Sequence, residues 1–559
     1  MLTTLAAPAF ADIWHIEDGD ITVKAGETGN DVTQKGTTTY GDTDTIITNS
    51  DKNTASSHTV TIETNDKNDK VEVTLKDVNI DTSSRNNAAV SVTGSGNTTI
   101  KLDGDNALKS DIYRSGIYGS GSGSLTISGG ENDSLTAQGG SGADGIYSSG
   151  SLTISGGTVT ANGDDGGRGI SSRGGVTISG GSTVTAKGGD GGSFGGGSGI
   201  SSFNRVAISG STVTANGGDS SSNSGGYGIS SLDVAISSGT VTANGGDSKD
   251  GSGGNGIYSS GGVTISSGST VTANGGDGED GSGGRGITSN GGVTVSGGTV
   301  NAKGGSGKNG NGGDGIRSFN PVAISGGTVN ANGGNSDYSN GGDGIRSLDH
   351  VAISGGTVKS NGGSGNLSGG NGIISYDIDL SGSLELTAKA GSPNGKALSR
   401  VGSELDLNTI KDKLDPGAKV TATDADGKVI QQVSIPRPVE PEEPSSSSDS
   451  GSATPSAPAS FLPGLTVTDK DGQRISYTST QSGNTLTVCV GRFMASLRIS
   501  LATLRQLRAE GIETITFQTI LCSTTLSVDE LLAMGGEDTE VVLTHHIRSS
   551  TLTVGGKAV

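Results

Sequence analysis

One internal repeat constrains the fold of this chain more than any other feature. A Gly-Ile pair recurs ten times between residues 116 and 373, and most copies precede a strand-like segment and a Thr-Val-Thr-Ala-Asn-Gly-Gly stretch or a variant of it. Successive isoleucines lie 29, 24, 30, 29, 28, 30, 29, 29 and 28 residues apart. A period of this size is typical of solenoids, in which each repeat forms one coil. The repeated isoleucines are Ile117, Ile146, Ile170, Ile200, Ile229, Ile257, Ile287, Ile316, Ile345 and Ile373.

The composition excludes the other common repetitive folds. Glycine makes up 102 of the 559 residues without Gly-X-Y order, which excludes collagen, and 11 prolines are too few for a polyproline rod. We interpret the glycines as turn residues. Only 29% of the chain is hydrophobic, but these residues recur in register with each repeat, so stacked repeats bury a continuous core.

Each repeat contains three segments in which apolar and polar residues alternate, separated by Gly/Ser turns. In one copy the alternation places Ile257 and Val263 inward, and Tyr258 and Thr264 outward. Because the next copy repeats this choice, like residues stack above like. The sequence therefore predicts an all-β fold: a parallel β-helix over residues 58–383, with three strands in each coil of about 29 residues and about a dozen coils.

The sequence changes character on both sides of the repeat. Residues 12–57 and 384–435 are predicted to cap the two ends, because an open terminal coil exposes unpaired backbone groups. The second cap includes a predicted short helix at residues 407–414. Residues 436–463, rich in Pro, Ser and Glu, are predicted to form an acidic linker, and residues 464–559 a small α+β domain.

The beginning of the chain suggests export. Residues 1–11 end in Ala9-Phe10-Ala11, the small-x-small pattern of a signal-peptidase site. The sequence predicts that they are the remnant of a signal peptide, cleaved before Asp12, whose start codon lies upstream. Two cysteines, Cys489 and Cys522, suit a protein that leaves the cytosol but uses few disulfides. We therefore expect an extracellular protein, secreted or attached to the cell surface.

The overall charge restricts the partners. A net charge of −20 disfavours nucleic acids and anionic membrane surfaces, because phosphate binding needs a basic stripe. No segment approaches the roughly 18 consecutive apolar residues of a spanning helix, so no membrane insertion is expected. We also expect a monomer.

The sequence offers little material for catalysis. The five histidines are dispersed, and neither cysteine has the setting of a nucleophile, so no catalytic triad is visible. We therefore expect a protein that is not an enzyme. Paired carboxylates for glycoside hydrolysis would come from different coils and would leave no local motif, so this alternative stays open.

Outward positions on the Gly-Ile strands are the candidate binding residues. Aromatic rings can stack on sugar rings, and two arginines one rung apart suit the carboxylates of an acidic polysaccharide. The alternative is that sporadic tyrosines and arginines only decorate a strand surface. The candidates for carbohydrate binding are Tyr118, Tyr147, Tyr258, Arg317 and Arg346.

A recurring aspartate in the turn after each third strand is the candidate metal site. Oxygen ligands in Gly-rich turns suit Ca²⁺. The alternative is a column of solvated acids, since carboxylates one rung apart repel each other by only about 1 kcal/mol in water. The candidate ligands are Asp165, Asp190, Asp219, Asp247 and Asp277.

Four stretches carry a resemblance to a known family: residues 71–80 (VEVTLKDVNI), 94–100 (GSGNTTI), 106–110 (NALKS) and 123–130 (GSLTISGG). With these stretches the chain resembles the clostridial carbohydrate-binding β-helix family of secreted and surface proteins in Gram-positive bacteria. The resemblance covers about residues 60 to 390. It implies a right-handed parallel β-helix akin to pectate lyases, which binds cellulose or pectin-like polymers and holds calcium.

These observations lead to three functional hypotheses. The first is a secreted or surface adhesin whose non-catalytic β-helix binds plant-type or acidic polysaccharide. The second is a pectate-lyase-like enzyme that uses calcium and an arginine base, Arg317 or Arg346. The third is a structural spacer without a ligand, which would display the C-terminal domain.

Overall fold

The computed structural model describes residues 12–436, apart from 193, 194 and 267, and most of 464–558. In the latter range it omits residues 470–473, 476, 483, 491–493, 520–522, 536–538, 546–549 and 556. The chain divides into two compact units, Met1–Glu440 and Pro441–Val559. The predicted signal-peptide remnant and all of the predicted linker except Pro436 lie outside the described residues.

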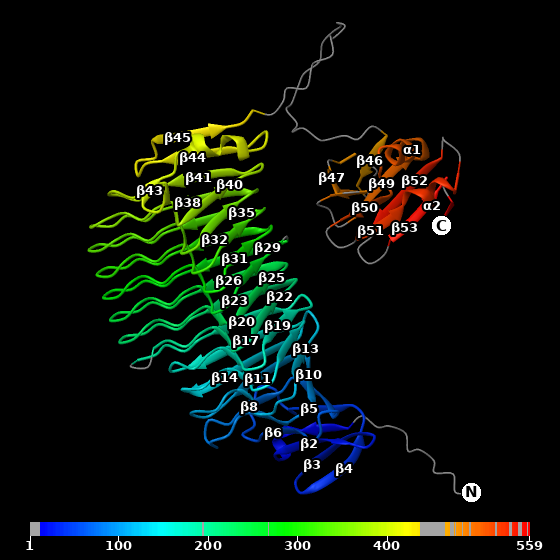
Figure 1. Cartoon of the computed structure of the whole chain (residues 1–559). Helices are drawn as coiled ribbons and strands as arrows, with labels where there is room; N and C mark the ends of the chain where they lie inside the picture. Colours follow the sequence, from blue (N-terminus) through cyan, green and yellow to red (C-terminus); the bar gives the residue numbers. More distant parts are fainter. Residues whose placement is uncertain are drawn as a thin grey trace, which may run out of the picture. The chain divides into compact units, whose positions relative to one another are not determined.

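The first unit is a right-handed parallel β-helix built from three sheets, as predicted (Figure 1). Sheet 1 has 14 strands, and they pair in parallel register. The expected dozen coils is therefore a slight underestimate. The strands of sheet 1 are β1 (Ile13–His15), β5 (Thr45–Thr48), β7 (Lys70–Lys76), β10 (Asn97–Asp103), β13 (Leu125–Ser128), β16 (Leu152–Ser155), β19 (Val176–Ser179), β22 (Arg205–Ile208), β25 (Asp233–Ile236), β28 (Val263–Ile265), β31 (Val293–Val295), β34 (Val322–Ile324), β37 (His350–Ile353) and β40 (Asp377–Leu380).

Sheet 2 contains the Gly-Ile strands, most of which are only three residues long. Its strands also pair in parallel, one per coil. They are β2 (Ile21–Gly26), β6 (Val60–Thr64), β9 (Val90–Gly94), β12 (Ile117–Gly119), β15 (Ile146–Ser148), β18 (Ile170–Ser172), β21 (Ile200–Ser202), β24 (Ile229–Ser231), β27 (Ile257–Ser259), β30 (Ile287–Ser289), β33 (Ile316–Ser318), β36 (Ile345–Ser347), β39 (Ile373–Ser375) and β42 (Leu398–Arg400).

Sheet 3 carries the Thr-Val-Thr segments and completes each coil. Its last strand, β45, is antiparallel to β44, and the other neighbours are parallel. The strands are β8 (Asn79–Asp81), β11 (Asp105–Lys109), β14 (Ser134–Ser141), β17 (Thr158–Asp164), β20 (Thr183–Lys187), β23 (Ser211–Asn216), β26 (Gly239–Asn244), β29 (Ser269–Asn274), β32 (Thr299–Lys303), β35 (Thr328–Asn332), β38 (Thr357–Asn361), β41 (Glu385–Lys389), β44 (Lys419–Thr423) and β45 (Val429–Ser434).

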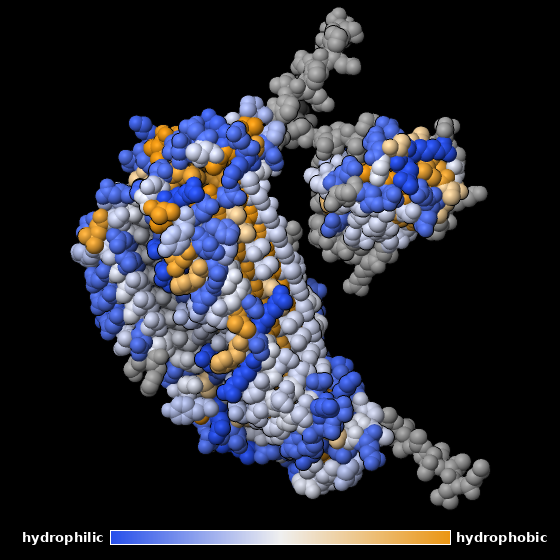
Figure 2. Space-filling model, viewed as in Figure 1, coloured by the Kyte–Doolittle hydropathy of each residue, from blue (hydrophilic) through white to orange (hydrophobic). Residues whose placement is uncertain are grey.

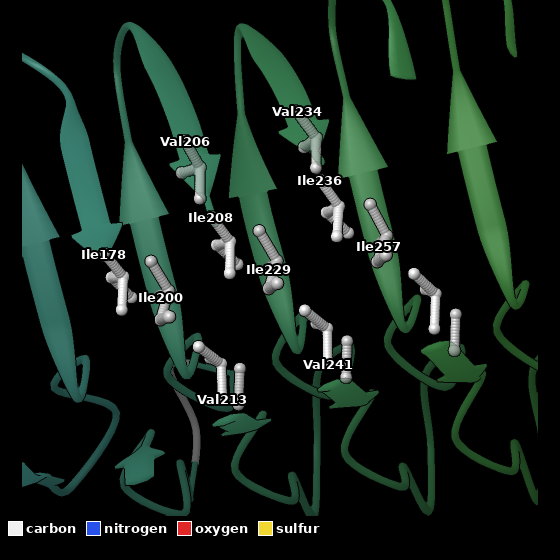
Figure 3. Packing of buried hydrophobic residues seen from close by; sticks show 14 of the residues in the cluster. Ile178, Ile200, Val206, Ile208, Val213, Ile229, Val234, Ile236, Val241 and Ile257 are labelled. Atoms are coloured by element: carbon white, nitrogen blue, oxygen red, sulfur yellow. The ribbon is translucent and has the colours of Figure 1, made fainter. Parts of the chain in front are cut away.

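The predicted inward residues form continuous stacks in the core. Ile178, Ile208 and Ile236 are register partners on successive coils of sheet 1, and each is at most 1% exposed. Figure 3 shows this row beside a second row that includes Ile200 and Ile229 from sheet 2. Full burial of each such side chain contributes about 1.5–3 kcal/mol, so every added coil lengthens the core by a similar increment.

Side-chain amides also stack outside the core. Asn244 Nδ2 donates to Asn216 Oδ1 over 2.8 Å, and Asn274 Nδ2 donates to Asn244 Oδ1 over 2.9 Å. Because the three residues are register partners on sheet 3, each amide can bond to the coils on both sides. The asparagines therefore form a structural ladder along the sheet.

Many of the repeated glycines are not turn residues, which corrects the interpretation from sequence. Between sheets 3 and 2 the loops pack backbone against backbone: Gly226 N donates to Gly218 O over 2.8 Å, and Gly246 N donates to Gly226 O over 2.9 Å. A Cβ on Gly226 would lie 1.9 Å from Gly197 O. These glycines are needed because the backbones of adjacent coils approach too closely for any side chain.

The coils extend into both predicted caps. Strands β1, β2 and β5 lie in residues 12–57, where the 3₁₀ helix η1 (Ile16–Asp18) also lies. Strands β3 (Gly29–Gln34) and β4 (Thr37–Asp42) add an antiparallel hairpin to β2. At the other end β43 (Ser403–Glu404) pairs antiparallel with β42. The predicted helix is the 3₁₀ helix η2 (Leu407–Lys413), whose Leu407 and Ile410 are buried. Hydrophobic residues gather at this end on the face drawn in Figure 2.

The second unit contains two sheets and two helices. Ser500 and Ser527 cap the helices, because their side chains accept hydrogen bonds from the backbone N–H groups of Thr503 and Glu530. Of the two cysteines, Cys522 lies outside the described residues. The elements are β46 (Leu465–Thr468), β49 (Ala495–Ser500), β52 (Glu540–His545), β53 (Ser550–Val554) and β54 (Lys557–Ala558) in one sheet, β47 (Thr478–Ser482), β48 (Thr485–Cys489), β50 (Thr514–Gln518) and β51 (Ser523–Ser527) in the other, and helices α1 (Leu501–Ala509) and α2 (Val528–Leu532).

Among the described residues, none of the helices has the length and apolar character needed to cross a membrane.

Candidate functional site

The five predicted binding residues lie in one column along the outside of sheet 2, here called the outward column. Each occupies the middle of its three-residue strand, and the parallel register places it directly above its counterpart on the previous coil. In chain order the outward column consists of Tyr118, Tyr147, Ser171, Ser201, Ser230, Tyr258, Thr288, Arg317, Arg346 and Ile374.

A second column runs beside it and consists of the residue two positions before each repeated isoleucine. This residue is flanked by glycines in most coils, and backbone hydrogen bonds align the coils, such as Gly286 N to Asp314 O and Gly315 N to Asp343 O. We call it the glycine-flanked column. It includes Asp144, Arg168, Ser198, Tyr227, Asn255, Arg285, Asp314, Asp343 and Asn371.

The tyrosines form two separate stacked pairs. The rings of Tyr118 and Tyr147 lie 5.4 Å apart and 16° from parallel. Tyr258 stacks instead on Tyr227 of the glycine-flanked column, at 5.2 Å and 17°. Four rungs separate Tyr147 from Tyr258, a distance of about 19 Å, and the outward column carries only serines between them. The structure therefore does not gather the three predicted tyrosines into one aromatic face.

The predicted arginines approach buried aspartates. Arg346 Nη1 lies 3.2 Å from Asp343 Oδ2, and Arg317 Nη1 lies 3.6 Å from Asp314 Oδ2. A third arginine, Arg285, brings its Nε to 3.6 Å from the same Asp314 oxygen. The guanidinium group of Arg317 also lies over the ring of the exposed Phe319, 5.4 Å from its centroid. Three cations thus surround two carboxylates on adjacent rungs.

Burial shifts the pKa values of two residues in this cluster, Asp343 and Arg317. Asp343 is 5% exposed, and its burial, reinforced by the neighbouring carboxylate of Asp314, raises its pKa to about 6. Hydrogen bonds from Asn371 N and Nδ2 to Asp343 Oδ1, of 2.6 and 2.8 Å, act in the opposite direction. Burial, together with the charge of Arg285, lowers the pKa of Arg317. A cluster of perturbed ionisable groups on one surface is typical of functional sites.

Three donors in the outward column have no acceptor. Within the described part of the chain, Thr288 Oγ1 and the Nε atoms of Arg317 and Arg346 are buried without a hydrogen-bond partner. They belong to three successive coils. An unmade hydrogen bond of a buried group costs about 1–3 kcal/mol, and proteins satisfy most such groups. These three atoms are closed to solvent, whereas the side chains of Arg317 and Arg346 as a whole are 22% and 37% exposed, so an anionic ligand can reach the two arginines at their exposed parts.

A groove of about 260 Å³ adjoins this stretch at Arg346. Its other walls are mostly apolar and come from Leu348, Ile374, Tyr376 and Val401. The groove extends this region from Arg346 toward the C-terminal end of the β-helix, and sequence reasoning did not predict it.

Four of the five predicted metal ligands have a structural role in common. Asp190, Asp219, Asp247 and Asp277 occupy one turn position, and each accepts a backbone N–H bond from the next coil; the bond from Asp277 N to Asp247 Oδ1, for example, is 2.7 Å long. Burial raises the pKa of Asp247, and the charges of Asp277 and Asp219 raise it further. Asp165 lies outside this ladder and accepts a hydrogen bond from Ser141 Oγ instead.

No metal cluster is evident around these acids. In the described residues there is no group of three or more His, Cys, Asp or Glu side chains arranged to hold a metal ion. A groove of about 450 Å³ beside Asp247 and Asp277 also contains two lysines, Lys249 and Lys308, and Lys308 Nζ lies 2.8 Å from Glu279. Calcium binding therefore stays a prediction from sequence.

Sequence reasoning missed Tyr227 and Arg285 and the burial of Asp314 and Asp343. The signal lay in the residue two positions before each isoleucine, which changes from Tyr to Arg to Asp while the flanking glycines stay constant. Once the coils are stacked, this position borders the outward column.

Comparison with known proteins supports the scaffold. A family model described as a beta helix repeat matches residues 152–175, 206–231, 234–256 and 322–345. Neither the search of curated proteins nor the search of solved structures gives a match. The repeat match and the three-sheet architecture identify a parallel β-helix protein.

Proposed function

We propose that this parallel β-helix protein is a secreted or cell-surface, non-catalytic binder of plant-type, acidic polysaccharide. The polymer would lie along the outward column, parallel to the helix axis. One observation carries the proposal: next to Thr288, Arg317 and Arg346 stack on successive coils with side chains that are 22% and 37% exposed. The stacked rings of Tyr227 and Tyr258 adjoin this stretch and offer an aromatic edge to sugar C–H groups.

The geometry suits a polymer better than a small molecule. Successive coils lie about 4.8 Å apart, so neighbouring rungs of the column, such as Arg317 and Arg346, can contact an elongated ligand at that interval. Arginine is the residue best fitted to carboxylates, because its planar fork can donate two parallel hydrogen bonds. Carboxylates on the polymer would accept hydrogen bonds from the partly exposed side chains of Arg317 and Arg346.

Retention on immobilised polygalacturonate tests the proposal. The double variant Arg317→Ala/Arg346→Ala should lose most retention, and Tyr118→Ala/Tyr147→Ala should weaken it if the polymer extends to the first tyrosine pair. Unchanged retention in both variants would refute the proposal.

A charge-matched control separates specific contacts from a change in net charge. Arg205→Ala/Lys308→Ala also removes two positive charges, but from sheet 1 and from the groove beside the acidic ladder. It should retain the polymer as the unmodified protein does.

Repeating the assay with a chelator tests the predicted calcium requirement, since a calcium-dependent complex would be lost. A pure spacer would show no retention in any arm.

A polysaccharide lyase is the second candidate, and one observation favours it. Burial and the charge of Arg285 lower the pKa of Arg317, which is the direction an arginine needs to accept a proton from the carbon next to a carboxylate. Incubation with polygalacturonate distinguishes the two functions. Growth of the ultraviolet absorbance of unsaturated uronides would identify a lyase, and retention without it a binding protein.

A further inference from the structure

The groove beside Arg346 has an apolar character that a bare acidic sugar does not explain. In the outward column Ile374 follows Arg317 and Arg346, so a branched hydrocarbon takes the place of a cation. The corners after β39 and β42 add Tyr376 and Val401 from successive coils, with 65% and 70% of their surfaces exposed. The volume of the groove, about 260 Å³, is that of a small ligand group and not of a whole polymer.

Val401 is held in a backbone conformation that valine disfavours. Its φ is +48°, and Gly402 follows with φ +81° in the two-residue turn that joins β42 to β43. Such a turn favours Asn-Gly, because β-branched residues crowd the backbone when φ is positive. The exposed valine gains little from burial in return. Strained residues of this kind cluster at binding sites, so the valine side chain itself is the feature to be explained.

We propose that the groove binds an O-acetyl group on a uronate residue of the polysaccharide, an inference that rests on the proposed function. Arg346 lies at the junction of the groove and the outward column, and its side chain is 37% exposed. It would bind the uronate carboxylate. The acetyl methyl would then contact Ile374 and Val401, and the ring of Tyr376 would lie against the C–H face of the sugar.

The chemistry selects this ligand over its relatives. A methyl ester would remove the carboxylate that the guanidinium group needs, and an unsubstituted uronate would present hydroxyl groups to the apolar walls without hydrogen-bond partners. An O-acetyl uronate keeps the charge and adds one compact apolar group. The outward column would therefore bind the carboxylate of a uronate unit, and the groove would bind the O-acetyl group of the same unit.

Two forms of one polymer test the inference: O-acetylated polygalacturonate, and the same sample after mild alkaline de-acetylation. The intact protein should bind the acetylated form about fourfold more tightly, the ratio expected from burying one methyl group. Val401→Asn should abolish this preference and keep affinity for the de-acetylated form. It should also raise the melting temperature, because asparagine suits the turn.

The outcomes separate the two proposals. Equal binding of both forms by the intact protein, or an undiminished preference in Val401→Asn, would overturn the acetyl inference alone. Absence of binding to either form would overturn the proposed function and this inference with it. Ile374→Thr supplies a second variant that keeps a β-branched strand residue. It should also reduce the preference, and it does not alter the turn.

Discussion

Replacing Asp343 with asparagine should change how the stability of the β-helix depends on pH. The carboxylate is 5% exposed, and burial with the nearby Asp314 raises its pKa to about 6 from an ordinary value of 3.8. A raised pKa means that the charged form is less favourable in the folded protein than in the unfolded chain. The stability contributed by the neutral form is thus fully present below about pH 4 and is lost as the pH rises through about 6.

The magnitude follows from the shift. About two pKa units correspond to about 3 kcal/mol, which is an upper value because the coupled Asp314 shares the titration. Asparagine is neutral at every pH, so Asp343→Asn should remove this decline. As the pH rises from 4.5 to 7.5, the free energy of unfolding of the variant should therefore increase by about 1–3 kcal/mol relative to that of the unmodified protein. Asn255 and Asn371 already occupy the glycine-flanked column, so the side chain fits this position.

Urea unfolding followed by tryptophan fluorescence measures the effect. Trp14 is the only tryptophan of the chain and lies in β1 of the helix, where its indole Nε1 donates to Asp42 over 3.0 Å. Asp250→Asn is the control: this aspartate is exposed, and its substitution should leave the pH dependence unchanged within about 0.5 kcal/mol. Parallel pH curves for the unmodified protein and Asp343→Asn would refute the account of a destabilising buried charge.

Three further substitutions test the scaffold. Gly226→Ala should destabilise the helix by about 3 kcal/mol or more in urea unfolding, because its Cβ would lie 1.9 Å from a carbonyl oxygen, whereas Gly192→Ala, with open space around it, should change the free energy of unfolding by less than about 0.5 kcal/mol. Asn244→Ala removes two amide hydrogen bonds of the ladder and should lower the free energy of unfolding by about 1–2 kcal/mol. An unchanged free energy of unfolding would show that the ladder does not stabilise the β-helix. Ser500→Ala removes the cap of α1 and should lower the stability of the second unit by about 1 kcal/mol in thermal unfolding. The stability of the β-helix should not change.

The fold could be predicted because its information is local and repeated. Alternation of apolar and polar residues assigns each side chain to the inside or the outside, and a slip of one residue would invert the whole coil. The predicted inward residues Ile257 and Val263 are buried, and the register places each residue on its counterpart in the next coil. The same logic placed the outward residues in one column. This alternation could not predict the structure of the loops, because apolar and polar residues do not alternate there.

The misplacement of Asp165 shows this limit. The coil that contains it advances only 24 residues from Ile146 to Ile170, whereas the others advance 28 to 30. Without the long loop, Asp165 lies in a tight turn with φ +42° and cannot align with the ladder of aspartates above it. The close packing of glycine backbones in the loops between sheets 3 and 2 was missed for a related reason. Its constraint is the distance between backbones of different coils, and no pattern within one repeat encodes that distance.

The five predicted binding residues lie outside the stretches that match the beta helix repeat. One of the four stretches ends at residue 256, two before Tyr258, and another ends at Ile345, directly before Arg346. Core positions are restrained on every side by stacked neighbours, whereas most outward residues have neighbours on fewer sides and can change more readily. Ligand choice can therefore change within two or three coils while the repeat persists. Binding measurements on variants of single columns will decide the function.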